Sequence, residues 1–217
     1  MKKYVTEFIG TFFLVLTVGL AGGENAPIAI GSALMVMIYA GGHISGGHYN
    51  PAVTLGVLVR KRISSSDAAI YMGSQLAGAV VAALIIGLFR EIPTEAEQTL
   101  DTTKAIVAEL LGTFALVYVV LNVATVRANA GNSYFGLAIG FTVMVMAYSL
   151  GAYSGGAFNP AVAIGASVFK AFSWGNIWIY IVGCFGGGAI AAIIFNALNP
   201  EEKLPVTGPE HKIDKKK

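Results

Sequence analysis

The two halves of this chain repeat one another, and that repetition limits the possible folds more than any other feature of the sequence. A Glu-x-x-Gly-Thr-Phe segment at residues 7–12 recurs at residues 109–114. A longer segment, Ser-Gly-Gly-His-Tyr-Asn-Pro-Ala-Val at residues 45–53, recurs at residues 154–162 with Ala and Phe in place of His and Tyr. Both pairs keep their order along the chain, so we expect a fold made of two equivalent halves.

Apolar stretches fill most of the chain and indicate a membrane protein. Hydrophobic residues make up 55% of the 217 residues and charged residues 12%, whereas soluble domains carry about 25% charged residues. A helix needs about 20 apolar residues to cross a bilayer. We expect six spans, at residues 4–20, 27–42, 68–89, 105–125, 134–150 and 177–198. At about 1.5 Å per residue, two shorter apolar segments, 51–59 and 160–169, reach only half-way across.

The number of spans in each half determines how the halves are related. Each half holds three full spans and one half-helix, and an odd number of crossings makes the second half enter the membrane from the opposite side. The sequence therefore predicts an all-α membrane protein with six transmembrane helices and two re-entrant half-helices in an inverted internal repeat. The first repeat covers residues 1–100, the second covers residues 101–199, and a polar cytoplasmic tail covers residues 200–217. Such folds place their working site between the repeats, near the membrane midplane.

Basic residues are divided unevenly between the two predicted sides of the membrane. Cytoplasmic segments carry an excess of Lys and Arg, so the richer side predicts that both termini lie in the cytoplasm. Arg90, Lys104 and Lys170 fall on the poorer side. The richer side holds Lys2, Lys3, Arg60, Lys61, Arg62, Arg127, Lys203, Lys212, Lys215, Lys216 and Lys217.

Both half-helices begin with Asn-Pro-Ala. Asn is a favoured N-cap and Pro suits the first helical position, so two helix starts should meet tip to tip near the midplane. The Ser-Gly-Gly before each copy supplies non-helical backbone, which a membrane tolerates only where it is buried in protein or lines a water-filled cavity. We therefore expect a pore in which two free Asn amides bind water and the positive helix ends repel cations. The motif residues are Asn50, Pro51, Ala52, Asn159, Pro160 and Ala161.

These paired motifs resemble those of the aquaporin (major intrinsic protein) family, over residues 7–198. The resemblance implies a passive channel for water in the plasma membrane, assembled as a homotetramer. It also implies that Glu7 and Glu109 anchor the re-entrant loops; a proton relay is the alternative for such intramembrane carboxylates. The backbone carbonyls that would line the pore are those of Gly46, Gly47, His48, Gly155, Gly156 and Ala157.

The outer constriction departs from a common pattern of that family. Many aquaporins carry Arg directly after the second Asn-Pro-Ala, where this chain has Val162. By family spacing, the other filter positions fall at Ile30, Gly156 and Ala147, with Tyr148 as the alternative to Ala147. Such an Arg-free filter is similar to that of plant vacuolar-type aquaporins. Losing a fixed charge and side-chain bulk should relax selectivity, so we expect water and small neutral solutes to pass.

Two other functions remain open. One is a facilitator for glycerol, urea, ammonia or hydrogen peroxide, with water secondary, and the other is a structural or adhesion membrane protein with a closed pore. An enzyme is not expected, because no nucleophile, base and orienting group converge, and a lone Cys184 with two loop histidines predicts neither a metal site nor a cofactor. The net charge of +2 gives no sign of a nucleic-acid partner. The partners expected are water, small neutral solutes and the lipid bilayer.

Overall fold

The computed structural model describes residues 1–94 and 99–202. In these residues it contains helices and no strand, and six helices are long and apolar enough to span a membrane. They are α1 (Lys2–Leu20), α2 (Ala26–Ser45), α4 (Ser65–Ile86), α5 (Thr102–Thr125), α6 (Phe135–Ser154) and α8 (Ile177–Leu198). The short helices are α3 (Pro51–Val59), α7 (Pro160–Val168), η1 (Arg127–Asn129), η2 (Trp174–Asn176) and η3 (Pro200–Glu202). The predicted fold class is confirmed.

The boundaries differ from the predicted ones by a few residues. α2 extends to Ser45, three residues beyond the predicted end, and the second half-helix ends at Val168 rather than at residue 169. The predicted tail begins with η3, and the rest of it lies outside the described residues.

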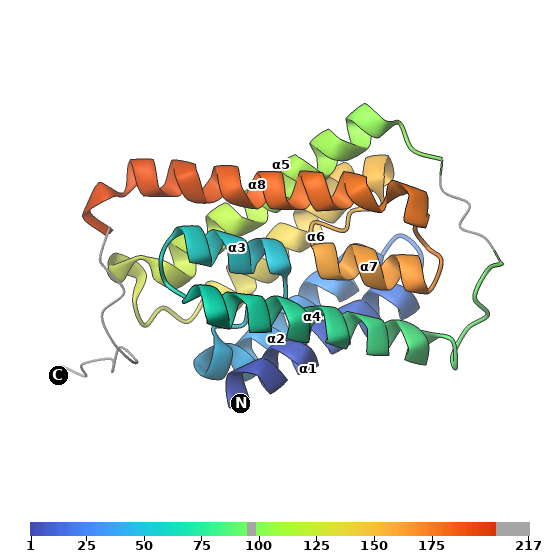
Figure 1. Ribbon diagram of the computed structural model, residues 1–217, viewed down its shortest axis with the longest axis horizontal. Helices are drawn as coiled ribbons and strands as arrows, with labels where there is room; N and C mark the ends of the chain where they lie inside the picture. Colours follow the sequence, from blue (N-terminus) through green and yellow to red (C-terminus); the bar gives the residue numbers. More distant parts are fainter. Residues whose placement is uncertain (95–98, 203–217) are drawn as a thin grey trace.

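The two half-helices lie end to end in the middle of the molecule. Figure 1 shows α3 and α7 between α8 on one side and α4 on the other, with α1 and α2 beyond α4. α3 packs on α4, α5 and α8, whereas α7 packs on α1, α4 and α8. The full-length helices therefore form a sheath, and the half-helices fill its centre from opposite ends.

Glycines bring the central helices into close contact. A Cβ atom added to Gly31 of α2 would lie 2.6 Å from the carbonyl oxygen of Gly140 in α6, and Gly140 is the matching glycine of the other repeat. Gly78 of α4 and Gly187 of α8 approach the backbones of α1 and α5 in the same way. Small residues at such crossings let helix backbones pack without intervening side chains.

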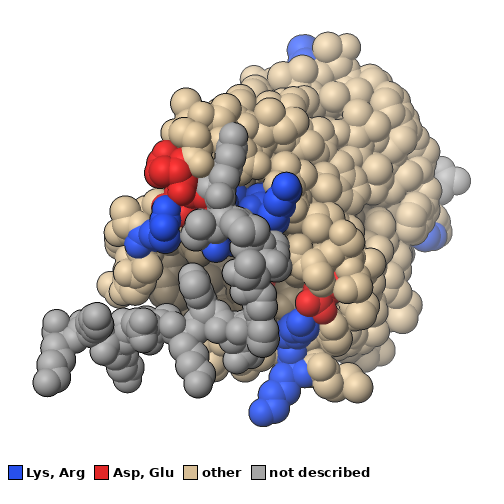
Figure 2. All heavy atoms as spheres, turned by 60° about the vertical axis from the view of Figure 1, so that its left-hand side comes forward, with Lys and Arg blue, Asp and Glu red and all other residues tan. Residues whose placement is uncertain are grey.

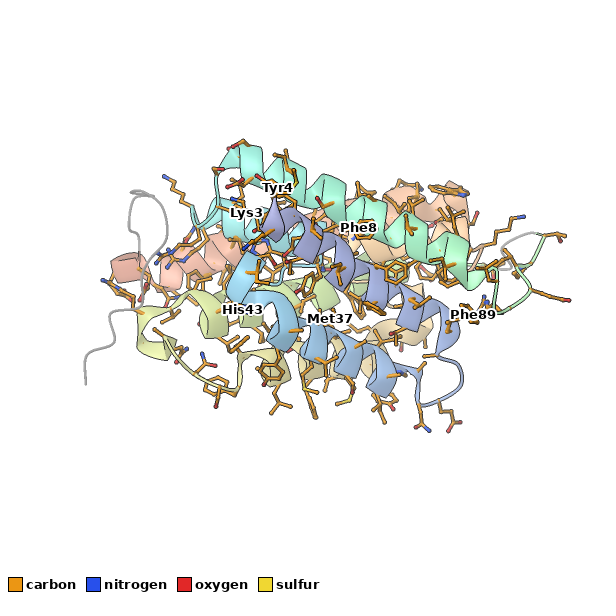
Figure 3. All side chains as sticks on the ribbon, turned by 90° about the horizontal axis from the view of Figure 1, so that it is seen from below. Lys3, Tyr4, Phe8, Met37, His43 and Phe89 are labelled. Carbon is orange, nitrogen blue, oxygen red and sulfur yellow. The ribbon has the colours of Figure 1, made fainter. Side chains whose placement is uncertain are left out.

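The outer surface of the sheath is apolar. In Figure 3, Lys3 and Tyr4 at the start of α1 lie near His43 at the end of α2, and Phe89 lies toward the opposite end. Between those ends, large hydrophobic side chains point outward, among them Leu84, Val182 and Ile193, which are 65%, 55% and 61% exposed. Such a surface suits lipid rather than water.

One end of the molecule carries a buried ion cluster. Arg60, directly after α3, has a side chain that is 1% exposed, and it donates from Nη1 to the backbone oxygen of Glu202 (2.6 Å) and from Nη2 to its carboxylate (3.3 Å). Arg62 and Arg127 also lie within 4 Å of that carboxylate, at 3.6 and 3.5 Å. Figure 2 shows the basic side chains gathered at this end. Glu202 thus ties α8 to the segments that follow α3 and α5.

Candidate pore

Each re-entrant loop begins where a helix is stopped by left-handed glycines. Gly46 ends α2 at φ 89° and Gly155 ends α6 at φ 90°, and the glycine after each has φ 63° and 67°. Two larger residues, Tyr49 (φ 48°) and Phe158 (φ 47°), adopt the same region, which costs a side chain about 1 kcal/mol or more. The two loops therefore share one backbone path, and something in each must stabilise it.

A buried carboxylate holds the first loop. Glu7 of α1 accepts hydrogen bonds from the backbone N–H groups of His48 (3.0 Å) and Tyr49 (2.7 Å) and from the hydroxyl of Ser45 (2.6 Å). It also accepts one from the amide of Gln75 in α4 at 2.8 Å. Each of these donors would cost about 1–3 kcal/mol if it were left unsatisfied in the interior.

The second loop is held in the same manner by Glu109 of α5. The carboxylate accepts from the backbone N–H groups of Ala157 (2.9 Å) and Phe158 (2.7 Å) and from the hydroxyl of Ser154 (2.7 Å). The fourth donor is the thiol of Cys184 in α8, at 3.3 Å. Both glutamates thus accept hydrogen bonds from the loop backbone, and the anchoring role that the resemblance implied for them stays a prediction.

The glycine of each Glu-x-x-Gly segment makes room for an aromatic ring. Gly10 faces the ring of Tyr49, and Gly112 faces the ring of Phe158, so closely that a Cβ atom at either glycine would overlap the ring. The spacing that both segments share therefore serves two contacts. The carboxylate binds the loop N–H groups, and the glycine one turn later makes room for the aromatic ring of the residue before the asparagine.

The two asparagines are bound crosswise. Asn50 Oδ1 accepts from its own helix at the N–H of Ala52 (2.8 Å), while its Nδ2 donates to the backbone oxygen of Phe158 (2.9 Å) in the other loop. Asn159 does the same with Ala161 (2.9 Å) and with the backbone oxygen of Tyr49 (2.9 Å). The sequence predicted amide groups that are wholly free; instead, one N–H of each amide is used across the repeats, and no hydrogen bond from the second N–H is found among the described residues.

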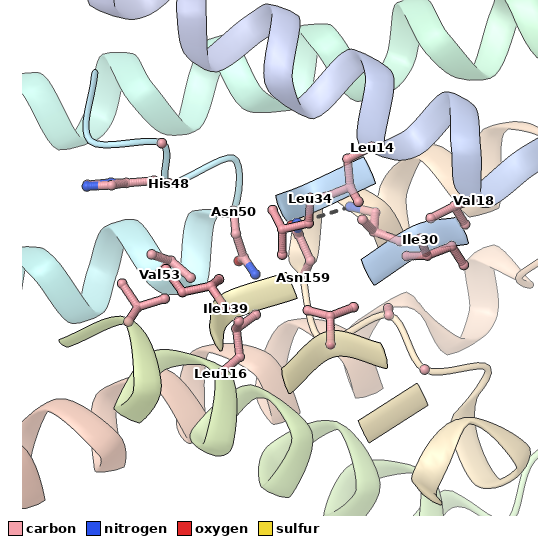
Figure 4. A pocket seen from close by; sticks show the side chains of 16 residues that line it. Leu14, Val18, Ile30, Leu34, His48, Asn50, Val53, Leu116, Ile139 and Asn159 are labelled. Atoms are coloured by element: carbon pink, nitrogen blue, oxygen red, sulfur yellow. Dashed lines mark hydrogen bonds between the residues drawn. The ribbon is translucent and has the colours of Figure 1, made fainter. Parts of the chain in front are cut away.

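A narrow cavity of about 30 Å³ runs past both asparagines. One water needs about 10–15 Å³ of such space, so the cavity admits only a few molecules at a time. Apart from Asn50, Asn159 and His48, its side chains are apolar. In Figure 4, Val18 and Ile30 lie on one side of the asparagine pair, and Val53 and His48 lie on the other.

The lining follows the repeat. The sixteen residues around the cavity form eight pairs, separated by 102 positions between α1 and α5 and by 109 positions elsewhere. The pairs are Leu14 with Leu116, Val18 with Val120, Ile30 with Ile139, Leu34 with Val143, Gly47 with Gly156, His48 with Ala157, Asn50 with Asn159, and Val53 with Val162.

Three of the four expected filter residues line this cavity: Ile30, Gly156 and Val162. Ala147 does not; it follows the lining residue Val143 by one turn of α6, and its alternative, Tyr148, is 51% exposed and does not line the cavity either. Gly46 and Gly155 are helix caps outside the lining.

The sequence interpretation missed the apolar wall on α1, α5 and α6, and it missed Leu34 of α2 and Val53 of α3. These residues carry no motif. The repeat could have revealed Ile139 and Val53, as the partners of Ile30 and Val162, but not the pairs of which neither member was predicted. Adding 102 or 109 to the number of a lining residue in the first half identifies its partner in the second half.

Comparison with known proteins decides what kind of protein this is. A family model for "Major intrinsic protein" matches residues 1–195. The chain belongs to the major intrinsic protein family. Its curated relatives include a glycerol uptake facilitator protein-like 6 from Lactiplantibacillus plantarum, 36% identical over 93% of this chain and 100% of the relative. They also include aquaporin TIP2-1 from Zea mays, 36% identical over 90% and 86%, and probable aquaporin NIP4-2 from Arabidopsis thaliana, 33% identical over 93% and 76%.

A solved structure supports the same fold. The X-ray structure of the aquaglyceroporin from Plasmodium falciparum matches with a TM-score of 0.78 and 22% identity, over 93% of this chain and 98% of that one. Major intrinsic proteins are channels rather than enzymes, so the chain is an integral membrane protein that forms a passive channel. Among the described residues, no three His, Cys, Asp or Glu side chains come together as a metal site.

Proposed function

We propose that this channel conducts water and also passes small neutral solutes through an apolar filter formed by Ile30, Gly156 and Val162. The observation that carries the proposal is the lining of the cavity, which contains no charged side chain among the described residues. A solute such as glycerol or urea can lay its carbon skeleton or flat face against Ile30 and Val162. No Arg donor occupies the space beside Val162 or competes for the polar groups of the solute.

Ions and protons are excluded in this proposal by the helix ends. α3 and α7 begin at Asn50 and Asn159, where the macrodipoles place about half a positive charge each. A water that accepts from both free amide N–H groups points its hydrogens away along the pore, which interrupts a chain of proton transfers. Cations would meet two positive ends in an apolar channel.

The test is stopped-flow light scattering on proteoliposomes, first with an impermeant osmolyte and then with glycerol and urea. Fast shrinkage followed by fast re-swelling supports a wide water channel. Val162→Arg should reduce the re-swelling rate by about tenfold, because it adds a charge and bulk to the filter. Unchanged solute flux in this variant would mean that the filter lies elsewhere.

A second candidate is a solute facilitator in which water is secondary. The apolar filter favours it, and one relative is named as a glycerol uptake facilitator-like protein. Solute flux that greatly exceeds water flux, at equal driving force, would select this function. Shrinkage no faster than that of empty liposomes would instead indicate a closed pore and a structural or adhesive role.

We further propose a homotetramer in the plasma membrane, with both termini in the cytoplasm and two inverted repeats at residues 1–100 and 101–199. The ion cluster of Arg60, Arg62 and Arg127 supports the orientation, because basic residues favour the cytoplasmic side. Native mass spectrometry of the detergent-solubilised protein tests the assembly, and protease access to a tag at either terminus in sealed vesicles tests the orientation.

A further inference from the structure

The filter proposed above has a structural counterpart at the other end of the cavity. Ile30, Gly156 and Val162, here called the α7-side ring, have Ile139, Gly47 and Val53 as their repeat partners. All three partners line the same cavity, and here they are called the α3-side ring. Figure 4 places Val53 and Ile30 on opposite sides of the asparagine pair. Both rings line the same cavity, so a molecule that crosses the protein through this cavity passes both.

We propose that the α3-side ring is a second selectivity constriction, and that His48 gives it a side-chain hydrogen-bond acceptor that the α7-side ring lacks. The proposal rests on the passage of neutral solutes proposed above. It assigns the discrimination among those solutes to both ends of the pore rather than to the α7 end alone.

The repeat pairs show where the two constrictions differ. Residues of the two rings are identical in type: Ile with Ile, Gly with Gly, Val with Val. Among the other lining pairs of the described structure, His48 with Ala157 is the pair that changes from polar to apolar. The three residues of each ring should therefore restrict size to a similar degree. The two ends differ at the position of His48, whose imidazole adds both bulk and polarity where the other end has the methyl group of Ala157.

His48 is held by a chain of side chains that the second repeat also lacks. Its Nδ1 lies 3.1 Å from the hydroxyl of Thr54, which is 2.9 Å from the amide Nε2 of Gln75. That Nε2 also donates to Glu7 at 2.8 Å. In the second repeat, the positions of His48, Thr54 and Gln75 are taken by Ala157, Ala163 and Cys184. All three polar members are thus replaced together, as expected if they act as one unit.

The proposal requires one tautomer of His48. The Thr54 hydroxyl lies 3.0 Å from the backbone oxygen of Asn50 and 3.1 Å from His48 Nδ1, and its one hydrogen can be donated to either. When it is donated to Asn50, the hydroxyl accepts from Gln75 Nε2 and from His48 Nδ1, which then carries the proton. In a neutral imidazole the other nitrogen is then an unprotonated acceptor. No hydrogen bond to Nε2 is found within the described residues, which leaves this acceptor for a molecule in the pore.

An acceptor at this point changes the cost of passage for different solutes. A solute that is stripped of water in a narrow apolar ring loses hydrogen bonds, and each unmet donor is costly. Glycerol and urea carry several O–H or N–H donors, so they gain more from His48 than a solute without donors does. The α3-side ring should therefore favour donor-bearing solutes of a given size.

The first test compares matched substitutions in the two rings. Val53→Phe and Val162→Phe add the same bulk at repeat-related positions, and Val182→Phe, at a side chain that is 55% exposed on α8, is the control. We expect both ring variants to lower urea and glycerol flux by at least about tenfold relative to water, and the control to match the parent. If Val162→Phe restricts the solutes and Val53→Phe leaves them within about twofold of the parent, the second constriction does not exist.

If Val53→Phe does not fold or abolishes water flux, another variant of the α3-side ring takes its place. Ile139→Phe narrows the same ring from α6, and Val53→Leu is a smaller change; either one decides the question by its solute-to-water ratio. Absence of solute flux in the parent protein would overturn the function proposed earlier. A response at Val162 without one at Val53 or Ile139 would overturn only the second constriction.

The second test concerns the acceptor. His48→Leu removes it with little change of volume, whereas His48→Gln keeps a polar group that can accept. We expect His48→Leu to lower the glycerol-to-water flux ratio by about fivefold, the effect of one lost hydrogen bond, and His48→Gln to restore most of it. Equal ratios in the two variants would show that His48 shapes the pore without binding the solute.

Discussion

The re-entrant loops of the two repeats follow the same backbone path but are supported by different side chains. Tyr49 and Phe158 have φ angles of 48° and 47°, and both loops give their backbone N–H groups to a glutamate. In the first repeat, Glu7 also accepts a hydrogen bond from the amide of Gln75. In the second repeat, Glu109 accepts one from the thiol of Cys184 instead. The comparison teaches that the loop backbone is the shared requirement, and that the surrounding network can vary between the halves.

The far ends of the half-helices differ more strongly. α3 is followed by Arg60, which is bound to Glu202 and lies with its guanidinium carbon 5.0 Å from the ring centre of Phe195. The matching residue after α7 is Phe169, a buried ring with Arg90 above it at 5.5 Å. The C-terminal end of α3 is thus held by an ion cluster and that of α7 by packing of an aromatic ring. Mutation and pH should therefore change the stability of the two ends differently.

The largest expected effect comes from removing a loop anchor. Glu7→Ala leaves two backbone N–H groups, a hydroxyl and a side-chain amide without their acceptor. Glu109→Ala leaves the equivalent backbone and hydroxyl donors without an acceptor, and its fourth unmet donor is a thiol. At about 1–3 kcal/mol per unmet donor, the free energy of unfolding of either variant should fall by more than about 4 kcal/mol. Because a thiol is a weak donor, Glu7→Ala should lower the midpoint of thermal unfolding in detergent further than Glu109→Ala. Equal losses would contradict the assigned difference between the loops.

The next effect should come from making the first half-helix end like the second. Arg60→Phe places after α3 the residue type that follows α7 at position 169. The change also removes the guanidinium that pairs with the buried carboxylate of Glu202. Breaking a buried ion pair in this way costs about 3 kcal/mol. A drop in the thermal midpoint of more than a few degrees checks it. Arg60→Phe with Glu202→Gln should recover part of the loss, since the unpaired charge is then gone.

Filling the glycine beneath each loop should have an intermediate effect. Gly10→Ala and Gly112→Ala push a methyl group into the rings of Tyr49 and Phe158, and overpacking of this kind costs about 1–3 kcal/mol. Gly73→Ala in α4 is the control, because a Cβ atom there meets nothing within 4 Å, and it should stabilise its helix slightly. Water permeability should fall for the two loop variants only; a normal rate in both would show that the loops tolerate displacement of the ring.

A smaller effect is expected when one network is converted into the other. Gln75→Cys gives the first repeat the residue found at position 184 and removes the hydrogen bonds to Glu7 and Thr54. Losing such bonds costs about 1–2 kcal/mol. The anchor should hold, so water flux should persist while the thermal midpoint falls. Loss of water flux at an unchanged midpoint would mean that Gln75 acts on the permeant directly.

The smallest expected effect is the pH dependence of stability that arises from the Glu202 carboxyl. Burial alone would raise the pKa of this carboxyl, but the hydrogen bond from the Arg127 backbone and the charges of Arg127 and Arg60 outweigh it and lower the pKa below its usual value. A carboxyl whose pKa is lowered on folding stabilises the fold at pH values above the ordinary pKa of Glu. This stabilisation is lost as the pH falls through the lowered pKa. The thermal midpoint should therefore drop on acidification below about pH 4, and less so in Glu202→Gln.

Much of this architecture could be predicted from the sequence because it is local or duplicated. Asn-Pro-Ala predicted the starts of α3 and α7, and each Asn does cap its helix. The crosswise bonds could not be predicted, because they join residues that are 108 and 110 positions apart. The cluster at Glu202 was missed for the same reason: Arg60 meets it across 142 positions, and no spacing in the sequence indicates that contact.

The filter shows where family spacing reaches its limit. Ile30, Gly156 and Val162 do line the cavity, because they are counted from rigid motifs nearby or from a helix with the same register. Their role as the filter stays a prediction. Ala147 was counted along α6, where one helical turn separates a lining position from its neighbour. Ala147 follows the lining residue Val143 by four positions and so lies on the same face of α6. The lining ends before that turn, and motif spacing gives no information on where a cavity ends along a helix.

The crosswise asparagine bonds also constrain how the channel is made during synthesis. When the first repeat leaves the ribosome, the Asn50 amide and the Tyr49 carbonyl lack the second loop with which they pair. These polar groups cannot remain unsatisfied in lipid. Until the second repeat is inserted, these groups need water as their partner. The crosswise bonds thus make the contact between the tips of α3 and α7 a product of the complete chain, which neither repeat can form alone.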